Sequence, residues 1–240
     1  MLSSPTVHGE GLRLSSNPVL AARVSVQSDP MIVLASASPR RQQLLRSAGI
    51  PFTVQPAEID ETPHQGESPR HCAERLAREK ALCVFKSRPG EWVLGADTIV
   101  VIDEAILGKP RDENDAARML RLLSGRTHRV ITGVCLGEDK VACGQWSAAS
   151  EAKPLKTEDR ELRTWVEDAR SETTLVTMSD LSDAEIGSYI ATGEPMDKAG
   201  AYAIQGIASR WIPRVEGDYS NVVGLPVALV YRMLTERSLI

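Results

Sequence analysis

Along the chain, short runs of apolar residues alternate with segments in which apolar side chains recur at helical spacing. The apolar runs are rich in β-branched residues and predict buried strands, whereas the periodic segments predict helices with one apolar face. The predicted elements are strands at 31–36, 51–55, 92–103, 128–136 and 210–215, and helices at 38–48, from 68, at 112–125, from 182 and from 226. Because strands and helices alternate, the chain is predicted to form an α/β fold with layers around a central sheet.

Two segments do not follow this alternation. Residues 1–30 are rich in Ser and lack the continuous apolar stretch of a signal peptide, so we expect a disordered tail ahead of a domain at 31–240. A mainly polar segment at about 147–172 interrupts that domain. Four of its apolar residues share one side of a helix: Leu162, Trp165, Val166 and Ala169. We interpret the segment as an inserted surface helix, with a partner-binding helix as the alternative.

Composition narrows the class of protein. With 42% apolar and 25% charged residues, the chain is typical of a soluble globular protein, and no apolar run reaches the roughly 18 residues of a membrane helix. The net charge of −4 argues against broad binding to nucleic acid or to a membrane surface. The four cysteines form no CxxC pair, so we expect reduced thiols and a cytoplasmic location; they are Cys72, Cys83, Cys135 and Cys143.

The start of the first predicted helix carries two adjacent cations. Ser38 and Pro39 open the helix, yet Arg40 and Arg41 follow in its first turn, where they oppose the positive end of the helix dipole. A strand that runs through a Ser-Ala-Ser turn into a helix presents backbone N–H groups and hydroxyls to an anion. We therefore favour a phosphate ligand here over the alternative, two solvated surface arginines.

Carboxylates gather at two other points. Glu58, Asp60 and Glu61 follow a predicted strand in AEIDE, and Asp97 interrupts the longest apolar run. A carboxylate among apolar residues needs a partner, because burying it alone is costly. Carboxylates near phosphates commonly hold Mg²⁺ or Mn²⁺, so we expect such a divalent cation. The alternatives are a solvated acidic turn for AEIDE and a turn-forming or ion-paired carboxylate for Asp97.

Lysines complete the candidate site. Lys80 lies on the helix that begins at 68, and Lys109 lies in a short GKP loop, although either alone is most often a surface lysine. Other site types lack their motifs, since GxxxxGK[ST], HExxH and GxSxG are all absent. His64, His71 and Cys72 lie near one another in the sequence, which is only a weak indication of a metal site.

The chain resembles the Maf family of nucleoside triphosphate pyrophosphatases in eight motifs that occur in the family's order. These are LASASPRRQQLL, AEIDE, AREKA, LGADTIV, LGKPRD, LSGRTHRVITGV, TGEPMDKAGAYAIQG and GDYSNVVGLP. The similarity extends from about Met31 to Leu234. The resemblance implies a mixed, elongated sheet flanked by helices, in two lobes with a central cleft. It also implies hydrolysis of a nucleoside triphosphate to the monophosphate and pyrophosphate, with a divalent metal as cofactor.

The resemblance also assigns residue roles. Glu61, Lys80, Asp97 and Lys109 match catalytic positions, and Asp97 matches the proton acceptor. Glu61 and Asp97 match the metal ligands. Five residues match substrate-binding positions: Ser36, Arg40, Arg41, Thr98 and Gln205. Of these, Arg40, Thr98 and Gln205 match positions linked to base selection, and an amide at Gln205 offers the uracil edge both a donor and an acceptor.

DKAGAYAIQG resembles the branch of the family that acts on dTTP and UTP, with modified pyrimidine nucleotides open as further substrates. A 7-methyl-GTP pyrophosphatase and a non-catalytic nucleotide-binding regulator of cell division are the alternatives. Family members are commonly homodimers, so we expect a homodimer. The tail and the inserted segment depart from the family's pattern and leave that expectation open.

Overall fold

The computed structural model describes residues 32–141 and 163–240. The strands are β1 (Ile32–Leu34), β2 (Phe52–Val54), β3 (Val93–Ile102), β4 (Ala105–Leu107), β5 (Thr127–Val141), β6 (Arg163–Thr177) and β7 (Arg214–Glu216). The α-helices are α1 (Pro39–Ser47), α2 (Pro69–Phe85), α3 (Glu113–Leu123), α4 (Asp183–Ile190), α5 (Tyr219–Val223) and α6 (Val227–Glu236). Short 3₁₀ helices lie at Glu194–Asp197, Ala199–Ala201 and Ile207–Trp211. None of the helices in these two described ranges is both long and apolar enough to cross a membrane.

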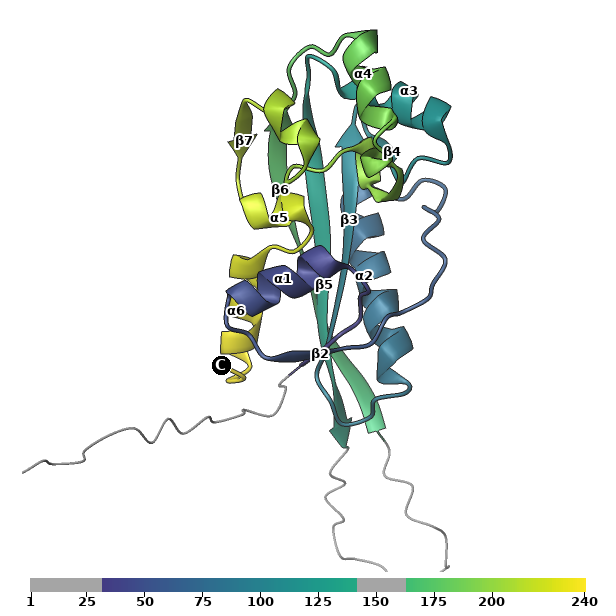
Figure 1. Cartoon of the computed structure of the whole chain (residues 1–240). Helices are drawn as coiled ribbons and strands as arrows, with labels where there is room; N and C mark the ends of the chain where they lie inside the picture. Colours follow the sequence, from purple (N-terminus) through teal and green to yellow (C-terminus); the bar gives the residue numbers. More distant parts are fainter. Residues whose placement is uncertain (1–31, 142–162) are drawn as a thin grey trace, which may run out of the picture.

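All seven strands belong to one mixed sheet. Its order is β2-β1-β3-β5-β6-β7, with β4 paired to β3. β1 pairs in parallel with β2 and with the start of β3, whereas β3, β5, β6 and β7 pair antiparallel with one another. β5 and β6 are paired from Thr127 opposite Thr177 to Val141 opposite Arg163, so the two strands run the length of the molecule (Figure 1).

Two apolar clusters divide the molecule into lobes around the shared strands. The upper lobe in Figure 1 is packed around α3, α4 and the 3₁₀ helices, with Leu120, Tyr189 and Trp211 in its core. The lower lobe is packed around β1, α1 and α6, with Leu45 and Met233 in its core. Helix α2 covers the other face of the sheet and packs against β3, β5 and β6. The predicted α/β class and the expected mixed, two-lobed sheet are confirmed.

The local signals place most elements correctly. Ser38 and Ser68 accept hydrogen bonds from the backbone N–H groups of Arg41 and His71, so the two Ser-Pro pairs do begin helices. Ser182 and Glu185 form the predicted capping box of α4.

The prediction of a helix over Leu162, Trp165, Val166 and Ala169 is wrong for the residues that the structure describes. Arg163–Thr177 is strand β6, paired along its whole length with β5. The indole of Trp165 lies over Gly137 of β5, where a Cβ would come within 1.9 Å of the ring. Long-range pairing therefore overrides the helical spacing of four apolar residues. The described residues do not include the expected tail at 1–30, Cys143, or the part of the segment from 147 to 162, which contains Leu162.

Other differences concern short elements. The predicted strand at 210–215 is replaced by the end of the 3₁₀ helix Ile207–Trp211 followed by β7. β4, a strand of three residues, was not predicted because its sequence is too short to carry a period.

Candidate functional site

A cavity of about 870 Å³ opens beside the middle of β3, between the two lobes. β1 pairs with β3 at Val93 and Leu94, and β4 pairs with it at Val100–Ile102, on the same side of the strand. Among the described strands, none covers that edge between these two pairings. Asp97 and Thr98 lie in this gap. Their side chains point to opposite faces of the sheet, yet both line the cavity. The site therefore forms at the unpaired stretch of the β3 edge.

The Ser-Ala-Ser turn and the start of α1 form the lower wall of the cavity. Ser36 Oγ accepts hydrogen bonds from the Ser38 backbone N–H at 3.3 Å and from Arg41 Nη1 at 3.0 Å. Arg41 is buried, and its Nε donates to the Gly224 carbonyl at 2.8 Å while Nη2 donates to Thr98 Oγ1 at 3.1 Å. Arg40 is half-buried and also lines the cavity. The predicted turn, hydroxyls and arginines are thus brought to one wall.

The arginines carry unneutralised charge. Among the described residues, neither Arg40 nor Arg41 has a carboxylate within ion-pair distance, and every acceptor bound by Arg41 is a neutral oxygen. Burial lowers the pKa of Arg41, and the negative charges of Asp97 and Glu61 partly offset this effect. A buried cation without a bound carboxylate favours an anionic ligand in the adjacent cavity. The anion inferred from the helix start thus has a place to bind.

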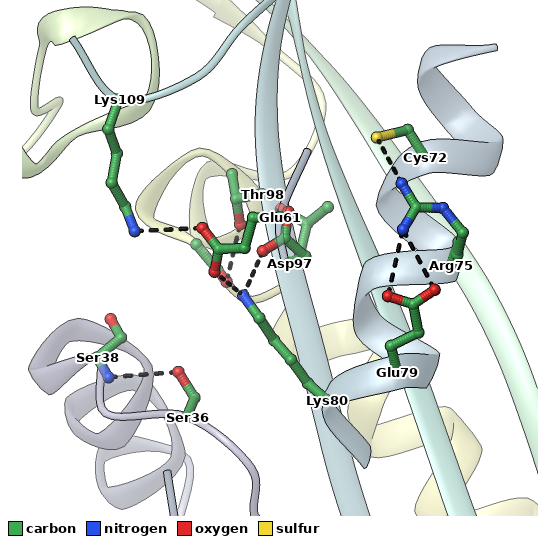
Figure 2. A network of polar contacts seen from close by, with 12 residues as sticks. Ser36, Ser38, Glu61, Cys72, Arg75, Glu79, Lys80, Asp97, Thr98 and Lys109 are labelled. Atoms are coloured by element: carbon green, nitrogen blue, oxygen red, sulfur yellow. Dashed lines mark hydrogen bonds and ion pairs between the residues drawn. The ribbon is translucent and has the colours of Figure 1, made fainter. Parts of the chain in front are cut away.

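Opposite this wall, two lysines and two carboxylates form one cluster (Figure 2). Lys80 Nζ donates to Glu61 Oε1 and to Asp97 Oδ1, each at 2.6 Å, and Lys109 Nζ lies 3.3 Å from Glu61 Oε2. Partial burial raises the pKa of Glu61, but the hydrogen bond and charge of Lys80 and the charge of Lys109 outweigh it and lower this pKa overall. Asp97 therefore has the partner that its burial requires.

Small residues bring Lys80 to this position. α2 presents Ala73, Ala77 and Ala81 to the sheet, and the facing position on β3 is Gly95. A Cβ on Gly95 would lie 2.1 Å from the Ala77 carbonyl oxygen, so only glycine allows the helix to pack this closely. Lys80 is 7% exposed at this packed face, from which its ammonium group reaches Asp97.

The donor set fits a divalent cation that also binds phosphate. Within the described ranges, no group of three or more His, Cys, Asp or Glu side chains could hold a metal ion by itself. Glu61 and Asp97 supply two neighbouring carboxylates around Lys80. Mg²⁺ is commonly held by one or two carboxylates together with substrate phosphates and water, so these two residues suit a metal that arrives with its substrate.

The upper lobe supplies the remaining wall. Gln205 is exposed and lines the cavity, as expected. The Thr98 hydroxyl binds Arg41, Thr132 and the Gly224 carbonyl. Sequence reasoning missed three cavity-lining residues, Asp197, Lys198 and Tyr202, although they lie in the same DKAGAYAIQG motif as Gln205.

Several candidates do not line the cavity. Glu58 and Asp60 are exposed, and Asp60 Oδ1 accepts from the Thr62 backbone N–H at 2.9 Å. Of the three acidic residues in AEIDE, only Glu61 therefore joins the site. His64 and His71 are exposed as well, and only Cys72 of that group reaches the cavity.

Comparison with known proteins covers the same part of the chain. The family model described as "Maf-like protein" matches residues 31–237, which include every residue of the cavity. The chain belongs to the Maf family. This Maf protein is 53% identical over 203 residues to the dTTP/UTP pyrophosphatase of Koribacter versatilis, a match that covers 85% of the chain and 92% of the relative.

Two further relatives bear the same name. The dTTP/UTP pyrophosphatase of Syntrophomonas wolfei is 47% identical over 204 residues, or 85% of this Maf protein and 96% of the relative. That of Geobacter sulfurreducens is 48% identical over 202 residues, or 83% and 92%. The similarity therefore spans nearly the full length of the relatives.

Proposed function

We propose that this protein hydrolyses dTTP and UTP, and modified pyrimidine nucleotides, to the monophosphate and pyrophosphate, and so clears such nucleotides from the cellular pool. One observation carries the proposal. The same cavity is lined on one side by two arginines that have no carboxylate within ion-pair distance among the described residues, and on the facing side by the cluster of two carboxylates and two lysines around Lys80. The choice of dTTP and UTP as substrates is based on the names of relatives that are 43–53% identical to this chain.

The reaction that fits this arrangement is attack of water on the α-phosphorus. The water oxygen forms a new bond to phosphorus, the bond from phosphorus to the oxygen bridging to the β-phosphate breaks, and pyrophosphate leaves. Asp97 accepts the proton of the water at Oδ2, which binds no donor among the described residues, whereas Lys80 holds Oδ1. Lys80, Lys109, Arg40 and Arg41 stabilise charge on the phosphoryl oxygens.

The metal belongs to the same proposal. Glu61 and Asp97 would hold Mg²⁺ or Mn²⁺ together with the phosphates. Such a cation would act as a Lewis acid that neutralises negative charge on the phosphoryl oxygens.

Base selection would fall to Gln205, with Arg40 and Thr98. Gln205 lines the same cavity as the Ser-Ala-Ser turn, and its amide can pair with the edge of uracil or thymine. We also infer a homodimer in the cytoplasm. The location is supported by the three described cysteines, all of which are free thiols: Cys72, Cys83 and Cys135.

The test is product analysis with purified protein, Mg²⁺ and a panel of dTTP, UTP, CTP, GTP and 7-methyl-GTP, resolved by ion-exchange chromatography. We expect monophosphate plus pyrophosphate from dTTP and UTP. Asp97→Asn should lose at least about 100-fold in kcat while still binding nucleotide, because it removes the proton acceptor but keeps a polar side chain.

Three other outcomes would contradict the proposal in different ways. Diphosphate plus phosphate would place the attack at the γ-phosphorus. Preference for 7-methyl-GTP would move the protein to another branch of the family. Nucleotide binding without turnover in the wild-type protein would favour a regulator over an enzyme.

A further inference from the structure

The Glu194 carboxylate contacts the backbone of the segment that carries Gln205. Glu194 Oε1 accepts hydrogen bonds from the Tyr189 hydroxyl at 2.9 Å and from the Ile207 backbone N–H at 3.1 Å, and Oε2 lies 3.3 Å from the same N–H. The Tyr189 oxygen in turn accepts from the Ala203 backbone N–H at 3.2 Å. One carboxylate and one phenol therefore hold positions 203 and 207, on either side of Gln205.

Between these two anchors the chain makes a tight turn. The Gly206 backbone N–H donates to the Ala203 carbonyl at 3.0 Å, which places Gln205 near the tip of the turn. Gln205 lines the cavity, and its amide makes no hydrogen bond to the described residues. Its position is therefore set by the backbone of the turn.

The carboxylate lies unusually close to this backbone. A Cβ on Gly206 would be 2.0 Å from Glu194 Oε1, so only glycine leaves room for the contact. Among the residues described, the Glu194 carboxylate has no cation within ion-pair distance, and Lys198 binds the Glu194 backbone oxygen instead. The Glu194 carboxylate thus accepts hydrogen bonds from the turn and from Tyr189, and a charged acceptor makes these hydrogen bonds stronger than those between neutral groups.

We propose that Glu194 is a positioning residue for base selection, which fixes the turn Ala203–Ile207 directly and through Tyr189 and so sets where the Gln205 amide meets the base. The inference rests on the proposed function, because it takes Gln205 as the residue that meets the base. A turn released from Glu194 would still carry Gln205, but the amide would sample several positions and discriminate less between a pyrimidine and a purine.

The test compares Glu194→Ala, Glu194→Gln and Tyr189→Phe with wild-type protein. The first readout is the ratio of kcat/KM for dTTP over that for GTP, and the second is the dissociation constant for GMP divided by that for UMP. The third is hydrogen exchange at the Ala203 and Ile207 amides. For Glu194→Ala we expect both ratios to fall about tenfold and hydrogen exchange to be faster at both amides. The kinetic ratio should fall through changes in KM rather than in kcat. Glu194→Gln keeps one acceptor oxygen, so it should restore part of the loss.

Glu185→Gln is the matched control. Glu185 is a carboxylate of the same lobe that also binds a backbone N–H, that of Ser182 at 2.8 Å, and an aromatic side chain, Trp211. We expect this variant to lose stability without changing either ratio.

Unchanged ratios in Glu194→Ala, or unchanged exchange at Ile207, would overturn the inference, as would a wild-type protein that binds UMP and GMP equally. If Glu194→Ala does not fold, Glu194→Gln and Tyr189→Phe carry the same comparison. Wild-type protein without turnover would contradict the proposed function, while the binding ratio and the exchange rates would still decide the inference.

Discussion

Arg40 and Arg41 are neighbours in the sequence but have different surroundings. Arg41 is buried and connects the start of α1 with Ser36, Thr98 and Gly224, so its guanidinium helps to hold the wall of the cavity. Arg40 is half-buried and free of hydrogen bonds within the described residues. Because consecutive helical residues point about 100° apart, one arginine can organise the wall while the other stays available to a ligand.

His128 provides a prediction about acid stability. It is 2% exposed, its Nε2 lies 2.8 Å from the Tyr202 hydroxyl, and burial lowers the pKa of His128 to about 4. In the unfolded chain the same ring has a pKa of about 6.5, so the unfolded state binds a proton first as the pH falls. The stabilising effect of keeping His128 neutral is full above pH 6.5 and is lost as the pH falls to about 4.

The loss amounts to about 2 kcal/mol at pH 5, on the basis of about 1.4 kcal/mol per pH unit. Urea unfolding of wild type and His128→Gln at pH 7 and pH 5 measures it. The variant keeps a polar atom near Tyr202 but cannot be protonated, so its stability should fall by about 2 kcal/mol less than that of wild type. Parallel pH dependences would contradict the assignment.

At the scale of elements, the close packing of α2 on the sheet connects stability with the site. A Cβ at Gly95 would collide with the Ala77 carbonyl, which lies less than one turn before Lys80. We therefore expect Gly95→Ala to push α2 away from β3, to reduce the free energy of unfolding by about 1–3 kcal/mol, and to lower kcat/KM for dTTP by at least about tenfold. Urea unfolding and steady-state kinetics measure the two effects.

Gly187→Ala is the control for this change. Gly187 lies in α4, and a Cβ there has no atom within 4 Å. Alanine favours a helix over glycine by up to about 1 kcal/mol, so the control should leave the enzyme as stable or more stable, with unchanged kinetics. A Gly95→Ala protein with normal kinetics would show that the position of Lys80 does not depend on this contact.

Across the whole molecule, the elements that could be predicted from the sequence are those whose position is determined by signals within a few residues of one another. Ser-Pro pairs, the capping box and long apolar runs locate α1, α2, α4 and β3, because these signals act within a few residues. The burial of Arg41 was not predictable, because its main acceptor, Gly224, lies 183 residues away in the chain. β6 was missed for the same reason, since its pairing with β5 decides its structure. Likewise, Gln205 was placed at the site by its motif, but the Glu194 contact that holds its turn is visible only in the fold.

The two lobes are expected to unfold together, because they share strands. β3 contributes Val100 to the core of the upper lobe and Leu94 to that of the lower lobe, and β5 contributes Val130 and Val134 in the same way. Neither lobe can lose its core without exposing one face of a strand that the other lobe needs, so unfolding should be one cooperative transition.

Leu120→Ala in the upper lobe and Leu45→Ala in the lower lobe test this expectation. Both side chains are at most 1% exposed, so each change should cost about 2–5 kcal/mol by leaving a cavity. Hydrogen exchange of α4 amides reports on the upper lobe and that of α6 amides on the lower lobe. Each variant should reduce the protection of the slowest amides in both helices by the same free energy. If a variant weakened only the helix of its own lobe, the lobes would be separate folding units, and the cavity between them could open without unfolding either.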